Sequence, residues 1–205
     1  MNRKNIKGII FDLDGTLVTS SIDFVMLKQE LGCPNDQDIL TYIAAIEDPQ
    51  KQQAALSLVI KVESEDALTS EYIPGVQTFL KTLIHNNIPM AIVTRNCRVA
   101  TSIKINNHNI PIKLVLTRED APCKPSPDAL NIIAEHWGFE PEEVVYVGDY
   151  IYDIQAANRA NMQAWAYQYQ VPEGTDLQVD FSFNCFTELD VNKLNLYIQK
   201  NSVKA

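Results

Sequence analysis

The sequence lacks the features of membrane-embedded, secreted and nucleic-acid-binding proteins. No apolar run approaches the roughly 18 residues needed to span a bilayer, and the apolar run after Lys7 is interrupted at Asp12, too early for the h-region of a signal peptide. Basic residues number 17 against 26 acidic ones, for a formal net charge of −9, whereas nucleic-acid backbones are bound by clustered lysine and arginine. We therefore expect a cytoplasmic protein with neither a nucleic acid nor a membrane as a partner.

Cysteine is also scarce and unpaired in the sequence. The four cysteines are widely spaced, and no two of them form a C-x-x-C pair. This spacing indicates neither a zinc site nor a disulfide framework, so we expect reduced thiols. The sequence contains no internal repeat and no low-complexity tract.

The length and composition are those of one globular domain with a modest addition. The chain has 205 residues, of which 46% are hydrophobic and 21% are charged. A chain of this length can bury a sizeable core, but a second full catalytic domain is not expected. We expect a monomer or a homodimer.

Short apolar segments alternate with helical patterns along most of the chain. The first strand is expected in the run that begins at Ile9, and four more over Ile88–Thr94, Ile112–Leu116, Val144–Gly148 and Met162–Tyr167. Helices are expected between them over Gly75–Asn86, Asn96–Asn107, Pro127–Trp137 and Ile151–Asn161. A short apolar piece at Val179–Phe183 and a final helix from about Glu188 to Gln199 end the chain. This alternation predicts an α/β fold, with a Rossmann-like parallel sheet and helices on both faces.

One segment, residues 19–72, interrupts this alternation. It contains no strand pattern, only amphipathic helical patterns over Ile22–Leu31, Asp36–Ile46 and Lys51–Val62. We therefore predict a core domain formed by residues 1–18 and 73–205 and a small helical cap formed by residues 19–72. Between Leu17 and Tyr72 the sequence has three lysines, no arginine and ten acidic residues.

Two carboxylates, Asp12 and Asp14, follow the first apolar run directly. Ligands of open α/β sheets bind at the carboxyl ends of the strands, so these acids are expected at the edge of an active site. Because residues two apart in a strand point to the same side, both side chains can face one ligand. Paired acids of this kind need a cation, and Mg²⁺ prefers oxygen ligands that include one or two carboxylates. Asp149 ends a later strand and is the natural second carboxylate.

Three further residues fit a phosphate site at the same edge of the sheet. Thr94 ends the second strand and can donate its hydroxyl to a phosphoryl oxygen, and it can also cap the helix that follows Asn96. Lys124, followed by two prolines in Lys124-Pro125-Ser126-Pro127, offers a positive charge for a nucleophile and a phosphoryl group. Asp153, one helical turn after Asp149, would orient a metal ligand or a water molecule.

In four motifs the chain resembles the haloacid dehalogenase-like superfamily, phosphatase branch. The motifs are Asp12-Leu13-Asp14-Gly15-Thr16, Thr94, Lys124-Pro125 and Gly148-Asp149 with Asp153. The resemblance implies that Asp12 is the nucleophile that forms an aspartyl-phosphate, and that Asp14 is the general acid and base. It also implies that the metal is bound by Asp12, Asp149 and the carbonyl of Asp14, while Asp153 orients the metal ligands from outside. The residues implied in substrate binding are Thr94, Arg95, Asn96 and Lys124.

The sequence departs from the family pattern at two positions. Tyr150 stands where a serine or threonine is common, and Arg95 stands where asparagine is common. Arg95 either binds the substrate or pairs with an acid. Because residues 19–72 hold few basic residues, we expect a neutral or cationic leaving group, or an anion contact supplied by Arg95.

The function implied is magnesium-dependent hydrolysis of a small phosphorylated metabolite, in the manner of phosphoglycolate phosphatases. Two alternatives remain open: a phosphomutase resembling β-phosphoglucomutase, which would re-donate the phosphoryl group, and a phosphate-binding protein without turnover. A true dehalogenase is disfavoured because it would leave Asp14 and the metal site without a task.

Overall fold

The computed structural model describes residues 5–189. Most of the final helix predicted from about Glu188 lies outside these residues. No helix in the described part of the chain combines the length and the apolar character needed to cross a bilayer.

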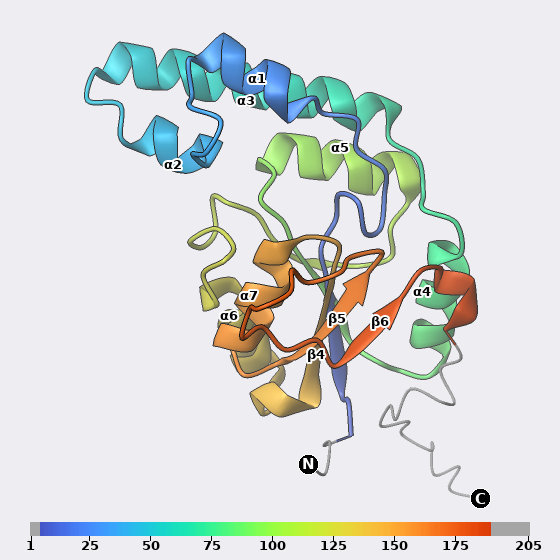
Figure 1. Cartoon of the computed structure of the whole chain (residues 1–205). Coiled ribbons are helices and arrows are strands. Elements are labelled where there is room, and N and C mark those ends of the chain that lie inside the picture. The colour runs from blue at the N-terminus through green and yellow to red at the C-terminus, as the bar shows by residue number, and fades with distance from the viewer. Residues whose placement is uncertain (1–4, 190–205) are drawn as a thin grey trace, which may run out of the picture.

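The centre of the molecule is a six-stranded, fully parallel sheet in the order β3-β2-β1-β4-β5-β6 (Figure 1). The strands are β1 (Gly8–Phe11), β2 (Met90–Val93), β3 (Leu114–Leu116), β4 (Val144–Gly148), β5 (Gln163–Tyr167) and β6 (Phe181–Phe183). The chain runs outward from β1 through β2 to β3 and then returns to the other side of β1 at β4. This reversal is the switch point where parallel α/β sheets bind ligands.

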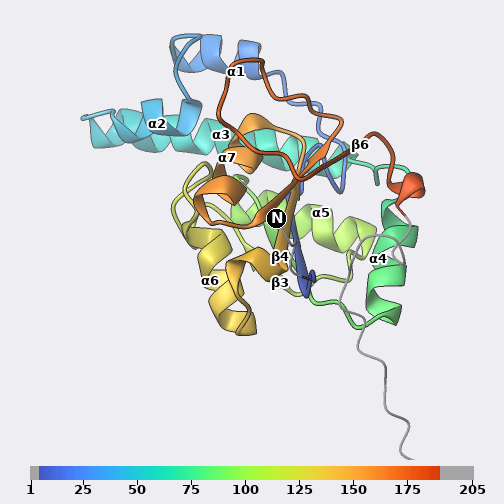
Figure 2. The ribbon, with the colours of Figure 1, turned by 60° about the horizontal axis from the view of Figure 1, so that its bottom comes forward.

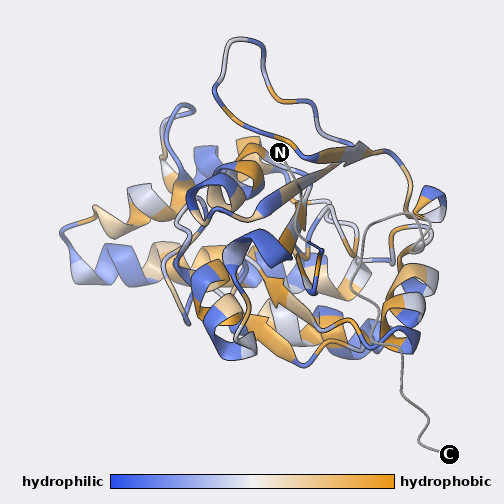
Figure 3. Ribbon diagram, turned by 90° about the horizontal axis from the view of Figure 1, so that it is seen from below, coloured by the Kyte–Doolittle hydropathy of each residue, from blue (hydrophilic) through white to orange (hydrophobic). Residues whose placement is uncertain are grey.

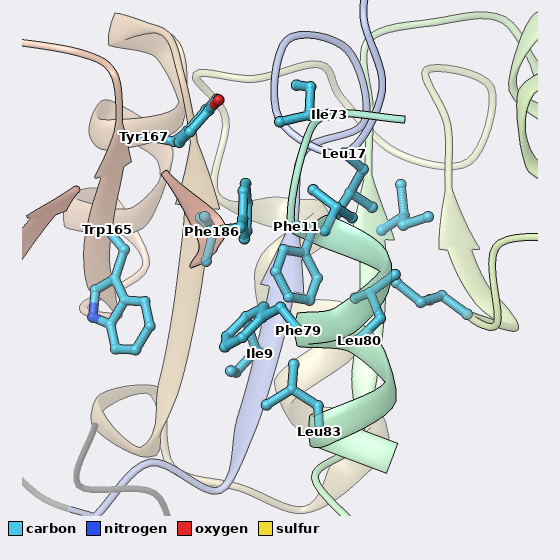
Figure 4. Close-up of a cluster of buried hydrophobic side chains, with 14 of the residues drawn as sticks. Ile9, Phe11, Leu17, Ile73, Phe79, Leu80, Leu83, Trp165, Tyr167 and Phe186 are labelled. Carbon is cyan, nitrogen blue, oxygen red and sulfur yellow. The ribbon is translucent and has the colours of Figure 1, made fainter. Parts of the chain in front are cut away.

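The continuous apolar sequence of β1 reflects burial on both faces of the sheet. Ile9 and Phe11 belong to one core cluster and Ile10 to another, because alternate side chains point to opposite faces. On the first face, Phe79 of helix α4 (Val76–His85) meets Phe11 edge to face, with ring centroids 6.3 Å apart. Figure 4 displays this cluster, with Leu80 and Leu83 beside the strand.

Helices cover both faces of the sheet, as the alternating sequence predicted. They are α4 (Val76–His85), α5 (Arg98–His108), α6 (Asp128–Trp137) and α7 (Ile151–Arg159). The two core clusters place α4 on one face of the sheet and α6 with α7 on the other. Figure 2 shows α4 and α6 on opposite sides of the strands. Apolar residues concentrate in the strands (Figure 3). The α/β fold class is therefore confirmed, and the apolar piece near Val179 supplies the edge strand β6.

Three helices stand between β1 and α4: α1 (Phe24–Leu31), α2 (Ile39–Ala44) and α3 (Pro49–Thr69). Each begins at an aspartate whose side chain accepts a backbone N–H of the first turn: Asp23, Asp38 and Asp48. The three helices share a small apolar cluster of their own around Leu27 and Ile43. We call residues 19–72 the helical insertion.

Helix α3 is longer than its sequence pattern predicted, because it ends at Thr69 and not at Val62. Its last turns pack on α5, where Ala67 meets Cys97 and Ala100 (Figure 1). Two acids of these turns, Glu63 and Asp66, are buried at 7% relative exposure. Acidic side chains are rarely buried without partners, so these two need partners on the core.

Candidate active site

Three carboxylates meet at the switch point of the sheet. Asp12 follows β1, Asp149 follows β4, and Asp153 lies in the first turn of α7; their carboxylate oxygens lie within 4.8 Å of one another. The register explains the meeting, because Phe11 pairs with Val147 and the Asp12 N–H donates to the Val147 carbonyl at 2.8 Å. All three were predicted site residues.

Two glycines make room for these acids. Gly15 has φ +74°, and a Cβ atom there would lie 2.2 Å from Asp149 Oδ2. A Cβ atom at Gly148 would lie 2.3 Å from Asp153 Cγ. The backbone thus passes directly against both carboxylates, which only glycine permits.

Lys124 is the cation of the cluster. It lies between β3 and α6, is 4% exposed, and places Nζ 2.7 Å from both Asp12 Oδ1 and Asp153 Oδ1. The Tyr146 hydroxyl donates to the same Asp153 oxygen at 3.1 Å, and the Tyr150 N–H donates to Asp153 Oδ2 at 3.0 Å. Lys124 therefore contacts the carboxylate predicted to act as the nucleophile.

The acids are electrostatically crowded. Burial raises the pKa of Asp12 well above its ordinary value, and the charges of Asp153 and Asp149 add to this rise while Lys124 opposes it. Burial, and then the charge of Asp153, raise the pKa of Asp149 to about 6, against a hydrogen bond from Thr16 Oγ1 at 2.7 Å. A single lysine thus leaves negative charge in excess.

This donor set fits a divalent metal ion. It consists of closely spaced carboxylate oxygens at one end of a cavity, which hard cations such as Mg²⁺ prefer. A bound cation would also relieve the repulsion that raises the pKa values of Asp12 and Asp149. Asp12 and Asp149 are the residues that would hold it, with Asp153 beside them.

Asp14 is held apart from the three-carboxylate cluster. Its Oδ2 accepts from the Asn96 side-chain amide, and its Oδ1 pairs with Lys104 Nζ. Burial raises the pKa of Asp14, and Lys104 opposes this rise. Asp14 and Asn96, both predicted site residues, are therefore in contact, but Lys104, the second partner of Asp14, was not predicted.

Thr94 and Arg95 line the same cavity. Thr94 is 5% exposed, and its hydroxyl accepts the Asn96 N–H at 3.1 Å. The Arg95 guanidinium pairs with Asp38 of the helical insertion, donates to the Lys124 carbonyl at 2.6 Å, and lies 4.8 Å from the centre of the Tyr152 ring. Of the two roles expected for Arg95, the structure contains the ion pair with an acidic residue, Asp38. Binding of the substrate by Arg95 stays a prediction.

The cavity has a volume of about 610 Å³ and lies between the sheet edge and the helical insertion. Its floor carries the predicted site residues. Its opposite wall comes from the insertion and includes Ile22, Phe24, Leu27, Lys28, Asp36, Asp38, Leu40 and Glu63. A small molecule in this space would touch both parts of the chain.

Sequence reasoning missed the buried ion pairs that hold the insertion on the core. Lys104 pairs with Asp14 and Asp66, and Arg118 pairs with Glu63. Glu63 also accepts the Cys97 N–H at 3.0 Å. A lysine or glutamate in a helical pattern is normally solvated, so only the length of the helical pattern beyond Val62 could have drawn attention to this surface.

The chain is similar to known hydrolases over most of its length. The haloacid dehalogenase-like hydrolase family matches residues 9–167. A haloacid dehalogenase-like hydrolase domain-containing protein of Arabidopsis thaliana is 32% identical over 168 residues, or 77% of this chain and 68% of the relative. A phosphoglycolate phosphatase of Chromobacterium violaceum is 27% identical over 219 residues, or 92% of this chain and 97% of the relative.

Solved structures have the same fold. A haloacid dehalogenase-superfamily hydrolase from Ehrlichia chaffeensis is 26% identical with a TM-score of 0.62, over 90% of this chain and 94% of the other. A hydrolase from Pseudomonas syringae, 20% identical, has a TM-score of 0.74 over 92% of this chain and 98% of the other. With the match over residues 9–167, these similarities establish that the chain belongs to the haloacid dehalogenase-like hydrolase family.

Proposed function

We propose that the protein hydrolyses a small-molecule phosphate monoester with Mg²⁺ as its cofactor. The observation that supports this most strongly is the position of Lys124, whose Nζ lies 2.7 Å from Asp12 Oδ1 inside a cluster of three carboxylates. Phosphoryl transfer needs positive charge close to the attacking oxygen, because phosphate oxygens repel an anionic nucleophile. Magnesium would supply the remaining positive charge and is assigned to Asp12, Asp149 and the carbonyl of Asp14.

The reaction would proceed in two steps at Asp12. In the first, an Asp12 carboxylate oxygen bonds to phosphorus while the bond from phosphorus to the leaving oxygen breaks, and Asp14 gives that oxygen a proton. In the second, water attacks phosphorus, Asp14 takes a proton from the water, and phosphate leaves with Asp12 regenerated. Thr94, Asn96 and Lys124 bind the phosphoryl oxygens.

The helical insertion would serve as the cap that selects the leaving group. It forms one wall of the cavity and contributes more acidic than basic residues. Relatives named phosphoglycolate phosphatases make 2-phosphoglycolate the first substrate to test. Since Asp38 already pairs with Arg95, we expect neutral or cationic leaving groups to be hydrolysed better. We place this activity in the cytoplasm, in a monomer or homodimer.

A phosphate-release screen over phosphorylated metabolites tests the proposal. Release is expected with Mg²⁺ and not with EDTA, and Asp12→Asn is expected to be folded and inactive. Asp48→Asn is the matched control, because Asn caps a helix as well as Asp and residue 48 starts α3 outside the cavity. Turnover by Asp12→Asn, or no release from any compound by the wild type, would refute the proposal.

A further inference from the structure

Lys104 is a buried lysine that neither the strand-end motifs nor the proposed reaction uses. It lies on α5, its side chain is 0% exposed, and lysine is almost never buried without partners. Its Nζ pairs with Asp14 and, at 2.7 Å, with Asp66 Oδ2. One ammonium group therefore joins the predicted proton-transfer residue to the helical insertion.

Asp66 links the two segments through which the insertion joins the core, one at its entry and one at its exit. It lies in the last turns of α3, near the exit of the insertion. Its Oδ1 accepts the backbone N–H of Ser21 at 2.6 Å and the Ser21 hydroxyl at 3.0 Å, and Ser21 lies at the entry. If the insertion shifts on the core, Asp66 must move, and Lys104 would transmit that movement to Asp14.

Within residues 5–189, two side-chain donors hold the Asp14 carboxylate in its orientation. Lys104 holds Oδ1 and the Asn96 amide holds Oδ2. A proton donor must lie within hydrogen-bond reach of the leaving oxygen, and small misplacements lower the rate strongly. Without Lys104, only the Asn96 contact to Oδ2 would remain, and the Asp14 carboxylate could rotate about that contact.

We propose that Lys104 is a positioning residue that aims Asp14 at the leaving oxygen and makes this aim depend on the seating of the helical insertion. The inference rests on the proposed function. It assigns Lys104 no contact with the substrate, because the cavity is lined by Asp14 and Asn96 but not by Lys104.

Leaving-group dependence separates this role from a structural one. p-Nitrophenyl phosphate releases a stable phenolate that needs no proton, whereas an alkyl phosphate needs Asp14 as the acid. General acids contribute typically 10²–10⁴-fold, so a misplaced one should forfeit about 10- to 100-fold in kcat/KM for an alkyl phosphate. For p-nitrophenyl phosphate, we expect Lys104→Met to lower kcat/KM less than about threefold.

The experiment measures kcat/KM with Mg²⁺ for p-nitrophenyl phosphate and for an alkyl phosphate that the wild type hydrolyses and whose leaving group carries no charge, so that the charges of the cavity wall act alike on both substrates. Asp66→Asn is a milder change and should also lower kcat/KM more for the alkyl phosphate than for p-nitrophenyl phosphate, by a smaller factor. This variant tests the inference if Lys104→Met does not fold. Glu63→Gln is the matched control. It breaks the other buried ion pair between α3 and the core, with Arg118, without touching Asp14.

We expect Glu63→Gln to change kcat/KM equally for both substrates. The role of Lys104 would be overturned if Lys104→Met or Asp66→Asn lowered kcat/KM equally for both substrates. It would also be overturned if Glu63→Gln lowered kcat/KM more for the alkyl phosphate than for p-nitrophenyl phosphate. Either result would leave the proposed function intact. A wild type that hydrolyses neither substrate nor any other phosphate monoester would instead refute the proposed function itself.

Discussion

Lowering the pH is expected to weaken magnesium binding in a range where ordinary aspartates do not titrate. Asp149 is a predicted metal ligand, and burial beside Asp153 raises its pKa to about 6. A metal ligand must be deprotonated, so protons compete with the cation for this carboxylate. The competition is strongest below pH 6 and disappears above pH 7.

The expected change in the apparent Kd for Mg²⁺ follows from the fraction of Asp149 that is ionised at each pH. With a pKa of about 6, about nine-tenths of the carboxylates are ionised near pH 7 and about one-tenth near pH 5. The apparent Kd for Mg²⁺ should therefore rise about tenfold, or about 1.4 kcal/mol, between these conditions. An aspartate with the usual pKa of about 3.9 would change this Kd by only about a tenth. Asp12, whose pKa is also raised, would increase the effect.

Isothermal titration calorimetry with Mg²⁺ near pH 7 and near pH 5, at constant ionic strength, measures the effect. Near pH 6, binding should also release about half a proton from Asp149, detectable in buffers of different ionisation enthalpy. Asp48→Asn should behave as the wild type, whereas Asp149→Asn should bind weakly with little dependence on pH. A change of less than about twofold in the wild-type Kd would show that no ligand of the metal titrates near pH 6.

The same site yields three further predictions. Lys124→Met leaves buried carboxylates unpaired, so urea unfolding near pH 7 with EDTA should give a free energy of unfolding lower by about 3–5 kcal/mol; a loss below about 1 kcal/mol would contradict this. Gly15→Ala should weaken Mg²⁺ binding and lower thermal stability, whereas Gly174→Ala, also at positive φ but with no atom within 4 Å of the added Cβ, should affect stability alone; equal Mg²⁺ affinities would argue against the close approach. Asp38→Asn keeps the helix cap and releases Arg95, so KM for 2-phosphoglycolate should fall about fivefold relative to a neutral alkyl phosphate; an unchanged ratio would mean that Arg95 does not meet the leaving group.

The sheet and the cluster around Asp12 could be predicted because their signals are local in the sequence. Apolar runs alternate with helical patterns, and Asp12, Thr94 and Asp149 each follow such a run directly. Parallel strands bring their carboxyl ends to one edge, so residues far apart in sequence meet without further information. Lys124 was recognised from its two neighbouring prolines. The catalytic and binding roles of these residues remain predictions.

The contacts between the helical insertion and the core could not be predicted in this way. Lys104 lies 90 residues from Asp14 and 38 from Asp66, and a charged residue in a helix gives no signal of burial. The same holds for Asp38 and Arg95, 57 residues apart. Such pairs depend on how the insertion sits on the sheet, which neither periodicity nor residue spacing encodes.

The proposal that Asp12 attacks phosphorus is tested most directly by trapping the intermediate. The wild type is mixed with Mg²⁺ and a hydrolysed phosphate monoester, quenched in acid during turnover, and mapped by mass spectrometry of its peptides. We expect a phosphoryl group on Asp12 in the wild type and none on any residue of Asp12→Asn. Phosphate release without phosphorylated Asp12, or a phosphoryl group on another residue, would contradict it.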